Sequence, residues 1–251
     1  DNYVAWCASL PNHTVSNTAG TITSETKANS FMSVVSYDNN AIAGTVGHGL
    51  SSAPEFIFSK ARTNAAGRWG VYSKTIGATN YMYLNETDAS AVSSALWNDT
   101  APDNTVFTVG TSVSTNDVGG QIAYAFTSVE GLCKVGSYTG TGVAGNAVDC
   151  GFEPAWIMIK RSDSIGSWIL LDSVRSAGNT LDDQLEANNN LGEVTDSSIF
   201  TTDVTANGFT MNGTHIYSNA SGGTYIYLAI AKNSPEDLRI KETFEASGIV
   251  A

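Results

Sequence analysis

The feature that most constrains the fold is an internal repeat with a period of about 100 residues. An apolar run at residues 151–161 has an earlier counterpart at residues 49–62, and their prolines, Pro54 and Pro154, lie 100 positions apart. In both copies a polar, Gly-containing turn follows, and then a second apolar segment headed by tryptophan. Proline suits the start of a strand, where its missing N–H removes no ladder hydrogen bond. Each copy is therefore predicted to form a β-hairpin.

The repeat extends beyond the hairpins in both directions. Upstream, residues 31–37 match residues 132–138 with an offset of 101. Downstream, residues 119–125 match residues 222–228 with an offset of 103. Offsets that drift so little indicate two tandem domains that differ by small loop insertions. This period is too long for a solenoid repeat and matches the size of one β-sandwich domain.

The composition indicates that both domains are all-β. Glycine supplies 24 of the 251 residues, and short apolar runs alternate with clusters rich in Gly, Asn, Ser and Thr. The run at residues 156–159 is too short for a helix and too apolar for an exposed strand, so it fits the core of a sandwich. Residues 89–97 fit either a short helix or a loop. We therefore predict two tandem antiparallel β-sandwich repeats.

The N-terminal residues resemble the strand that closes each repeat. Residues 3–7 are similar to residues 121–125 and to residues 224–228. This similarity predicts a piece of a longer protein that begins on the last strand of a preceding repeat; the alternative is a native first strand of similar sequence. The predicted boundaries are a closing strand at 1–10, a polar linker at 11–30, repeats at 31–130 and 131–232, and a charged linker or the start of another element at 233–251.

Charge and motif content argue against several classes of function. Lys and Arg number 12 against 24 Asp and Glu, which gives a net charge of −12. Nucleic-acid binding requires a basic face, so we expect no nucleic-acid partner. No segment approaches 18 consecutive apolar residues, so membrane insertion is not expected either. The sequence has no Asp-x-Asp-x-Asp-Gly calcium loop and no Cys-x-x-Cys zinc spacing, and we expect no metal and no cofactor.

The three cysteines, Cys7, Cys133 and Cys150, allow two interpretations. In the internal alignment Cys133 lies opposite Met32 and Cys150 lies opposite Leu50, so both occupy positions that are apolar in the first copy. Free cysteine behaves as a small buried hydrophobe, and both residues fit that role. The alternative is a disulfide between Cys133 and Cys150 across neighbouring strands.

No residue pattern typical of catalysis is present. A catalytic serine would need a Gly-x-Ser-x-Gly elbow or a nearby base, and the sequence has no such elbow. Glycoside hydrolysis needs two carboxylates at a fixed separation. Asp182, Asp183 and Glu186 form an acidic group that the first copy lacks, and solvated loop charge explains it better. The histidines, for which we expect no functional role, are His13, His48 and His215. We predict that the protein is not an enzyme.

The aromatic residues supply the candidate binding site. Flat rings offer contact area to a sugar at low entropic cost. Trp69 and Trp168 recur at equivalent positions, which favours core packing for both. Tyr81, Tyr83 and Trp97 have no obvious counterpart in the second copy, so these three are the candidate ligand-binding residues. Core packing is the alternative for them as well.

Five segments carry a resemblance to a widespread group of predicted tailed-phage proteins, many of them from marine phages. The segments are residues 15–24, 46–50, 97–102, 151–161 and 220–227. The likeness covers most of residues 3–231. It implies a tail-fibre-like or other virion-surface protein whose tandem β-domains are similar to concanavalin-like or jelly-roll sandwiches. It supplies no catalytic residues, and the charged residues after Pro235 depart from its pattern.

Together the repeat and the resemblance predict a non-enzymatic structural protein of the phage virion. It would be a segment of a tail fibre or surface appendage, located at the virion surface, and would bind host-surface glycans. Other virion proteins are the expected partners, and the resemblance alone favours a homo-oligomer, such as a trimer. The alternatives are a capsid-decorating or head-fibre protein without a ligand and, in a different class, a glycan-degrading enzyme.

Overall fold

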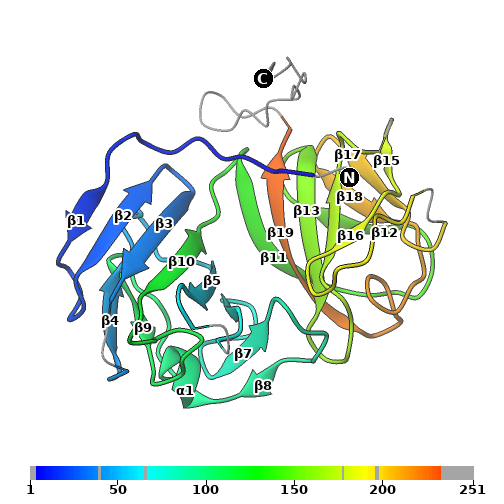
Figure 1. The fold of residues 1–251 in the computed structure, drawn as a ribbon. Coiled ribbons are helices and arrows are strands. Elements are labelled where there is room, and N and C mark those ends of the chain that lie inside the picture. Colours follow the sequence, from blue (N-terminus) through cyan, green and yellow to red (C-terminus); the bar gives the residue numbers. More distant parts are fainter. Residues whose placement is uncertain (1–3, 39–40, 65–66, 177, 196–197, 233–251) are drawn as a thin grey trace, which may run out of the picture.

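The computed structural model describes residues 4–38, 41–64, 67–176, 178–195 and 198–232, which form a nearly all-β molecule (Figure 1). The elements of the first half are β1 (Val15–Asn17), β2 (Ser24–Ala28), β3 (Met32–Tyr37), β4 (Gly44–Gly47), β5 (Phe56–Ala61), β6 (Gly70–Ser73), β7 (Asn80–Tyr83), β8 (Ala91–Val92), α1 (Ser94–Trp97), β9 (Val106–Val109) and β10 (Gln121–Phe126). Those of the second half are β11 (Cys133–Thr139), β12 (Asn146–Asp149), β13 (Pro154–Arg161), β14 (Ile169–Asp172), β15 (Thr180–Leu181), β16 (Leu185–Glu186), β17 (Thr202–Thr205), β18 (Gly208–Met211) and β19 (Thr224–Ala231).

Within the described ranges the strands form four antiparallel sheets. The first half has an eight-stranded sheet, in the order β1-β2-β3-β10-β5-β6-β7-β8, and a two-stranded sheet, β4-β9. The second half has a five-stranded sheet, β11-β19-β13-β14-β16, and a four-stranded sheet, β12-β18-β17-β15. The predicted all-β sandwich class is confirmed. The order β3-β10-β5-β6 in one half corresponds to β11-β19-β13-β14 in the other, although the predicted domain boundaries themselves stay a prediction.

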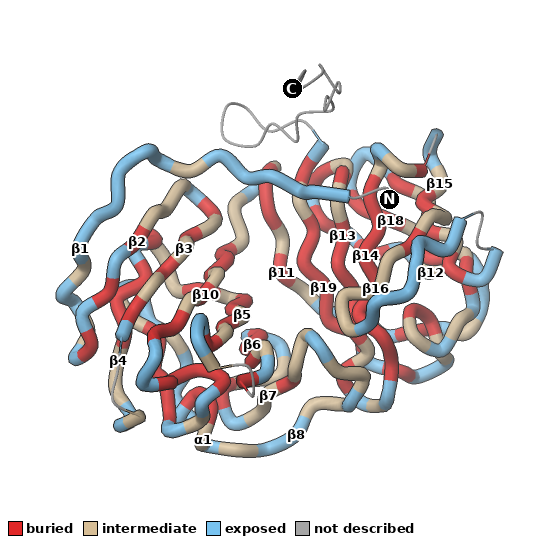
Figure 2. The backbone as a smooth tube through the Cα atoms, in the orientation of Figure 1, coloured by how far each residue is buried: buried red, intermediate tan, exposed pale blue. Residues whose placement is uncertain are grey.

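Buried apolar side chains of the described residues form three clusters, one between each pair of adjacent sheets. Figure 2 shows the buried stretches of backbone along the strands of both halves. The two large sheets lie back to back, so their strands are apolar on both faces. In β13, Ile157 and Ile159 point into the outer cluster of the second half, whereas Met158 points into the middle cluster between the halves. Burial on both faces explains why residues 156–159 form a continuous apolar run instead of an alternating one.

The two halves also share buried polar contacts at equivalent positions. A fully buried asparagine donates its side-chain amide to two backbone carbonyls in each half. The pairs are Asn116 with Ile42 and Gly110, and Asn219 with Val143 and Gly213. Backbone carbonyls that leave water must find a donor elsewhere, so each asparagine stabilises two loops at once.

A second equivalent contact fixes the tryptophan that heads the strand after the hairpin turn. Asn85 Oδ1 accepts a hydrogen bond from the backbone N–H of Trp69 at 2.9 Å, and Asn188 Oδ1 accepts one from Trp168 at 2.7 Å. The predicted core position is confirmed for Trp168, which is almost completely buried. Trp69 is only half-buried and stacks on Tyr124, with ring centroids 6.3 Å apart.

The predicted N-terminal strand is wrong. Residues 4–10 form no strand but an irregular segment that crosses from β1 toward the second half (Figure 1). The closing strands β10 and β19 each lie between two neighbours in a sheet, and residues 4–10 have no such pair of strands to join. The predicted linker at residues 11–30 contains β1 and β2, which extend the large sheet beyond β3. The prediction for residues 233–251 lies outside the described ranges.

Polar contacts join the two halves at the turn that follows β13. The indole Nε1 of Trp168 donates to the carbonyl of Tyr83 at 2.9 Å. Three further contacts join this turn to the segment after β7: Gly166 N to Thr87 O at 2.8 Å, Lys160 Nζ to Thr87 O at 3.2 Å and Ser90 N to Ser162 O at 2.9 Å. Because these bonds flank the middle apolar cluster, the halves pack as one block.

Candidate functional site

The structure does not bring the three predicted ligand-binding aromatics together on the surface. Trp97, at the end of α1, is 1 % exposed and belongs to the apolar cluster of the first sandwich, so its prediction as a binding residue is wrong. Its Nε1 donates to the backbone carbonyl of Val71 at 3.2 Å, which satisfies the indole inside the core. Trp97 has no counterpart because the helix that carries it occurs in the first half, among the described residues, and has no equivalent in the second.

Tyr81 and Tyr83 lie on one face of β7 and are half-buried against the same cluster. Their rings meet edge to face with centroids 5.1 Å apart, so they present no common flat surface. The guanidinium of Arg68 lies 4.9 Å from the ring centroid of Tyr83, and Arg68 Nε pairs with Glu86 at 2.8 Å. One face of Tyr83 is thus already occupied by a cation, and the binding role of both tyrosines stays a prediction.

Cys133 and Cys150 are both free thiols in the structure, so the alternative of a disulfide between them is not formed there. Cys133 lies in the middle cluster between the halves, whereas Cys150 lies in the outer cluster of the second sandwich. The two side chains therefore occupy separate cores. Burial raises the pKa of both thiols, that of Cys150 to about 12, which favours the unreactive protonated form. The interpretation as small buried hydrophobes is the one that fits.

The buried histidine at the end of β4 has a structural role. His48 accepts a hydrogen bond at Nδ1 from the backbone N–H of Leu50 at 3.1 Å. Nε2 must therefore carry the proton that it donates to the Asp103 carbonyl, also at 3.1 Å. Burial lowers the pKa of His48, so the neutral ring is favoured at pH 7.

The acidic residues of the second half lie around a turn that the Ser176 hydroxyl stabilises. The N–H groups of Asp182 and Asp183 both donate to the Ser176 hydroxyl, at 3.2 and 3.0 Å, while Glu186 lies in β16. No group of three or more His, Cys, Asp or Glu side chains in the described ranges is arranged to hold a metal ion.

A pocket of about 360 Å³ lies at one end of the first sandwich. Four segments line it: the loop before β5, the end of β6 with the residue that follows, the loop between α1 and β9, and the residues after β10. Their polar side chains include Glu55, Tyr72, Lys74, Asn104 and Ser128. We refer to this pocket, with these five polar residues, as the Glu55 pocket. Convergence of polar groups from separate segments on one hollow is typical of ligand sites.

The carboxylate of Glu55 is held in a fixed position. Lys74 Nζ donates to Oε1 at 3.0 Å, and the hydroxyl of Ser128 donates to Oε2. Burial raises the pKa of Glu55, but the hydrogen bonds from Ser128 and Lys74 outweigh it and hold the pKa below its usual value. Glu55 is therefore ionised at neutral pH and acts as a hydrogen-bond acceptor.

The other side chains of the Glu55 pocket supply donors. Burial and the nearby Glu55 carboxylate raise the pKa of Tyr72 to about 12, so its phenol stays protonated. Its hydroxyl makes no hydrogen bond to any described residue. Asn104 uses Oδ1 to accept from the backbone N–H of Ala53 at 3.2 Å. The carboxylate of Glu55, the ammonium of Lys74 and the phenol of Tyr72 all line this pocket, and together they suit a ligand rich in hydroxyl groups.

Sequence reasoning missed this pocket, although the repeat contained a signal for it. Glu55 follows Pro54, whereas the residue after Pro154 in the second copy is Ala155, which is buried. A carboxylate at a position that is apolar in the other copy is costly to bury unless it is paired.

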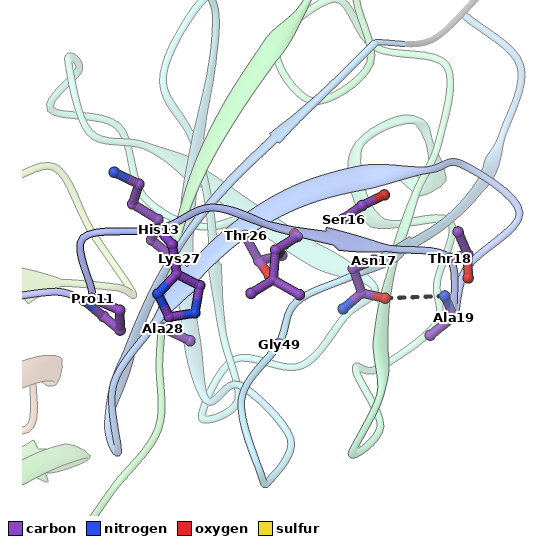
Figure 3. A pocket seen from close by; sticks show the side chains of 11 residues that line it. Pro11, His13, Ser16, Asn17, Thr18, Ala19, Thr26, Lys27, Ala28 and Gly49 are labelled. Carbon is purple, nitrogen blue, oxygen red and sulfur yellow. Dashed lines mark hydrogen bonds between the residues drawn. The ribbon is translucent and has the colours of Figure 1, made fainter.

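A second depression, of about 550 Å³, runs beside the β1-β2 hairpin (Figure 3). His13, Asn17 and Lys27 line it, and Asn17 Oδ1 accepts a hydrogen bond from the N–H of Ala19 at 3.0 Å (Figure 3). Most of its lining comes from this single hairpin and the segment before it, and His13 is exposed. The depression is larger than the Glu55 pocket but less well enclosed by separate segments.

The fold and the pocket together define an all-β protein of two stacked sandwiches, with a pocket at one end that polar side chains from separate segments help to line. The chain belongs to the family whose model is described as a domain of unknown function (DUF7483), which matches residues 1–235. Neither a curated protein nor a solved structure was found to match. Across the described ranges, no helix is long and apolar enough to cross a membrane.

Proposed function

We propose that this chain is a non-enzymatic structural segment of a tailed-phage virion, part of a tail fibre or another surface appendage. The observation that supports the proposal is the middle apolar cluster, to which both halves of the chain contribute and which joins them into one block. A surface appendage must keep its shape under load, and repeated domains that share a core resist bending. Other virion proteins are its partners, and it assembles as a homo-oligomer, such as a trimer.

We further propose that the segment binds a host-surface glycan through the Glu55 pocket. The pocket volume of about 360 Å³ lies in the range of small-ligand sites. The Glu55 carboxylate accepts hydrogen bonds from sugar hydroxyls, while Lys74 and Tyr72 donate. Repeated low-affinity sites on an oligomer gain avidity without new contacts, which suits adhesion.

Immunogold labelling of whole virions with antibody to this segment tests the location. Label on the tail or its appendages supports the proposal. Label spread over the head would instead favour the capsid-decorating alternative, and unlabelled particles would overturn a virion role. Sedimentation of the intact protein tests the oligomer, because a monomer would remove that part of the proposal.

A glycan array tests the binding role with a matched pair of variants. Glu55→Gln is expected to lose binding, whereas Glu153→Gln, which alters the partly exposed ion pair with Lys232 outside the pocket, is expected to keep it. Equal binding by both variants would exclude the Glu55 pocket. Shortening of a polysaccharide incubated with the protein would contradict the non-enzymatic assignment and favour the glycan-degrading alternative.

A further inference from the structure

An apolar cleft of about 330 Å³ opens between the two large sheets. Phe58, Tyr124 and Phe126 line it from the eight-stranded sheet, and Trp156, Met158 and Ile230 line it from the five-stranded sheet. We refer to it as the inter-sheet cleft. It continues the middle apolar cluster toward the surface, and it is separate from the Glu55 pocket, with which it shares no lining residue.

The inter-sheet cleft is lined mainly by aromatic and aliphatic side chains. Phe58 and Tyr124 stack with ring centroids 5.0 Å apart and an interplanar angle of 30°. No Asp, Glu, Lys, Arg or His side chain of the described residues lines the cleft. The indole Nε1 of Trp156 is buried and has no acceptor among the described residues. Because this nitrogen is fully buried, the wall offers apolar and aromatic surface and no accessible hydrogen-bond donor from Trp156.

A short segment of the chain covers the cleft. Residues 6–8 lie along it, and the ring of Trp6 meets that of Trp156 edge to face at 6.2 Å. Trp6 Nε1 donates to Asp172 Oδ2 at 3.1 Å, and the guanidinium of Arg175 lies 5.7 Å from its ring. Trp6 nevertheless remains 37 % exposed. The indole of Trp6 thus lies at the opening of the cleft, which indicates that the cleft accommodates an aromatic ring.

We propose that the inter-sheet cleft is a binding site for an uncharged aromatic molecule of about two fused rings. A dry apolar cavity of about 150 Å³ takes up one benzene, and this cleft has roughly twice that volume. Charged molecules are excluded because no lining group compensates the loss of hydration.

Fluorescence titration with prodan, a neutral naphthalene that carries one ketone, tests the proposal. Prodan emission shifts to the blue on transfer from water to an apolar site, and we expect saturable binding of one molecule per chain. Ala187→Phe places a ring in the cleft and is expected to weaken binding at least tenfold. Ala91→Phe, at an exposed position of β8, is the matched control and is expected to bind like the wild type.

The proposal is overturned if the wild type shows no saturable blue shift, or if Ala187→Phe binds as well as Ala91→Phe. Near-UV circular dichroism of each variant establishes that its tertiary packing is intact. If Ala187→Phe does not fold, Ile230→Phe fills the cleft from β19 of the same five-stranded sheet and replaces it, with the same expected loss.

Discussion

At the scale of single residues, the buried asparagines are among the side chains on which both sandwiches depend most. Asn116 and Asn219 each join two loops by donating to two carbonyls, and both are fully buried. Asn219 also uses Oδ1 to accept the N–H of Thr141 at 2.9 Å and the side-chain amide of Asn146 at 3.0 Å. Both the oxygen and the nitrogen of the Asn219 side-chain amide are thus hydrogen-bonded. Water could take over these hydrogen bonds only if the loops opened.

Asn219→Ala is expected to lower the free energy of unfolding by about 3 kcal/mol, because it leaves the buried carbonyl of Gly213, and the part-buried carbonyl of Val143 and N–H of Thr141, without their partner. Urea denaturation followed by tryptophan fluorescence measures the change. The control is Asn190→Ala, an exposed position, which is expected to change stability by less than about 0.5 kcal/mol. Equal effects of the two substitutions would contradict the structural role of Asn219.

A second residue of this kind is Lys160, which is fully buried at the junction of the halves. Its ammonium donates to the carbonyls of Thr87 at 3.2 Å and Arg161 at 2.7 Å. Burial lowers the pKa of Lys160 to about 8, although the nearby carboxylates of Asp88 and Asp163 oppose the shift. The charged form is therefore unfavourable in the folded protein relative to the unfolded chain.

A lowered lysine pKa means that the folded state binds fewer protons above pH 8, so the contribution of Lys160 to stability rises with pH. The thiols of Cys133 and Cys150, whose pKa values are raised, act in the opposite direction in every variant. We therefore compare the wild type with Lys160→Met. The difference in free energy of unfolding, wild type minus variant, is expected to rise by about 2 kcal/mol between pH 7.5 and 9.5.

Lys60→Met, at the equivalent position of the first half, is the control for this pH series. Lys60 is half-buried and bonds only to carbonyls of its own hairpin turn, those of Asn64 and Gly67. The wild type is compared with Lys60→Met over the same range, so that effects common to replacing a hairpin-turn lysine by methionine are measured separately. A pH-independent difference for Lys160→Met would show that Lys160 does not titrate there.

At the scale of elements, the turns after β9 and β18 depend on glycine because the backbone of another segment lies against it. A Cβ added at Gly110 would lie 2.3 Å from the carbonyl oxygen of Ala95, and one at Gly213 would lie 2.2 Å from that of Ile199. Gly110→Ala and Gly213→Ala are each expected to cost about 3 kcal/mol in urea denaturation. Gly192→Ala, which would meet no atom within 4 Å, is the control and is expected to be neutral.

The N-terminal segment is an element that the sandwiches do not require. Asp172 keeps its ion pair with Arg175, at 2.6 Å, when Trp6 is removed. Deletion of residues 1–10 is expected to leave the far-UV circular dichroism spectrum unchanged and to lower the free energy of unfolding by about 1–2 kcal/mol. Loss of the β-sheet signal would contradict this, because it would make the segment part of the folding core.

Strands could be predicted from the sequence, whereas their neighbours and their burial could not. The run at residues 156–159 is a strand, as its length and apolar character predict. That both of its faces are buried depends on two sheets packing back to back, which local sequence does not encode. Trp97 was assigned to a binding site because the second copy lacks it, yet an unmatched residue can equally fill a core that differs between the copies.

At the scale of the whole molecule, the middle apolar cluster decides whether the repeats act as one body or two. Phe56 and Val71 enter it from the first half, and Trp168 and Leu228 from the second. Phe56 and Trp168 meet edge to face across the junction, with ring centroids 6.3 Å apart. Separation of the halves would expose this apolar surface to water, so each half stabilises the other.

Differential scanning calorimetry tests this account most directly. A shared core predicts that the chain unfolds in a single transition whose calorimetric enthalpy equals its van't Hoff enthalpy. It also predicts that Met158→Ala, which opens a cavity at the middle cluster from one half, lowers the temperature of that one transition without splitting it. Two transitions in the wild type, with only one of them moved by Met158→Ala, would contradict a rigid block of two sandwiches.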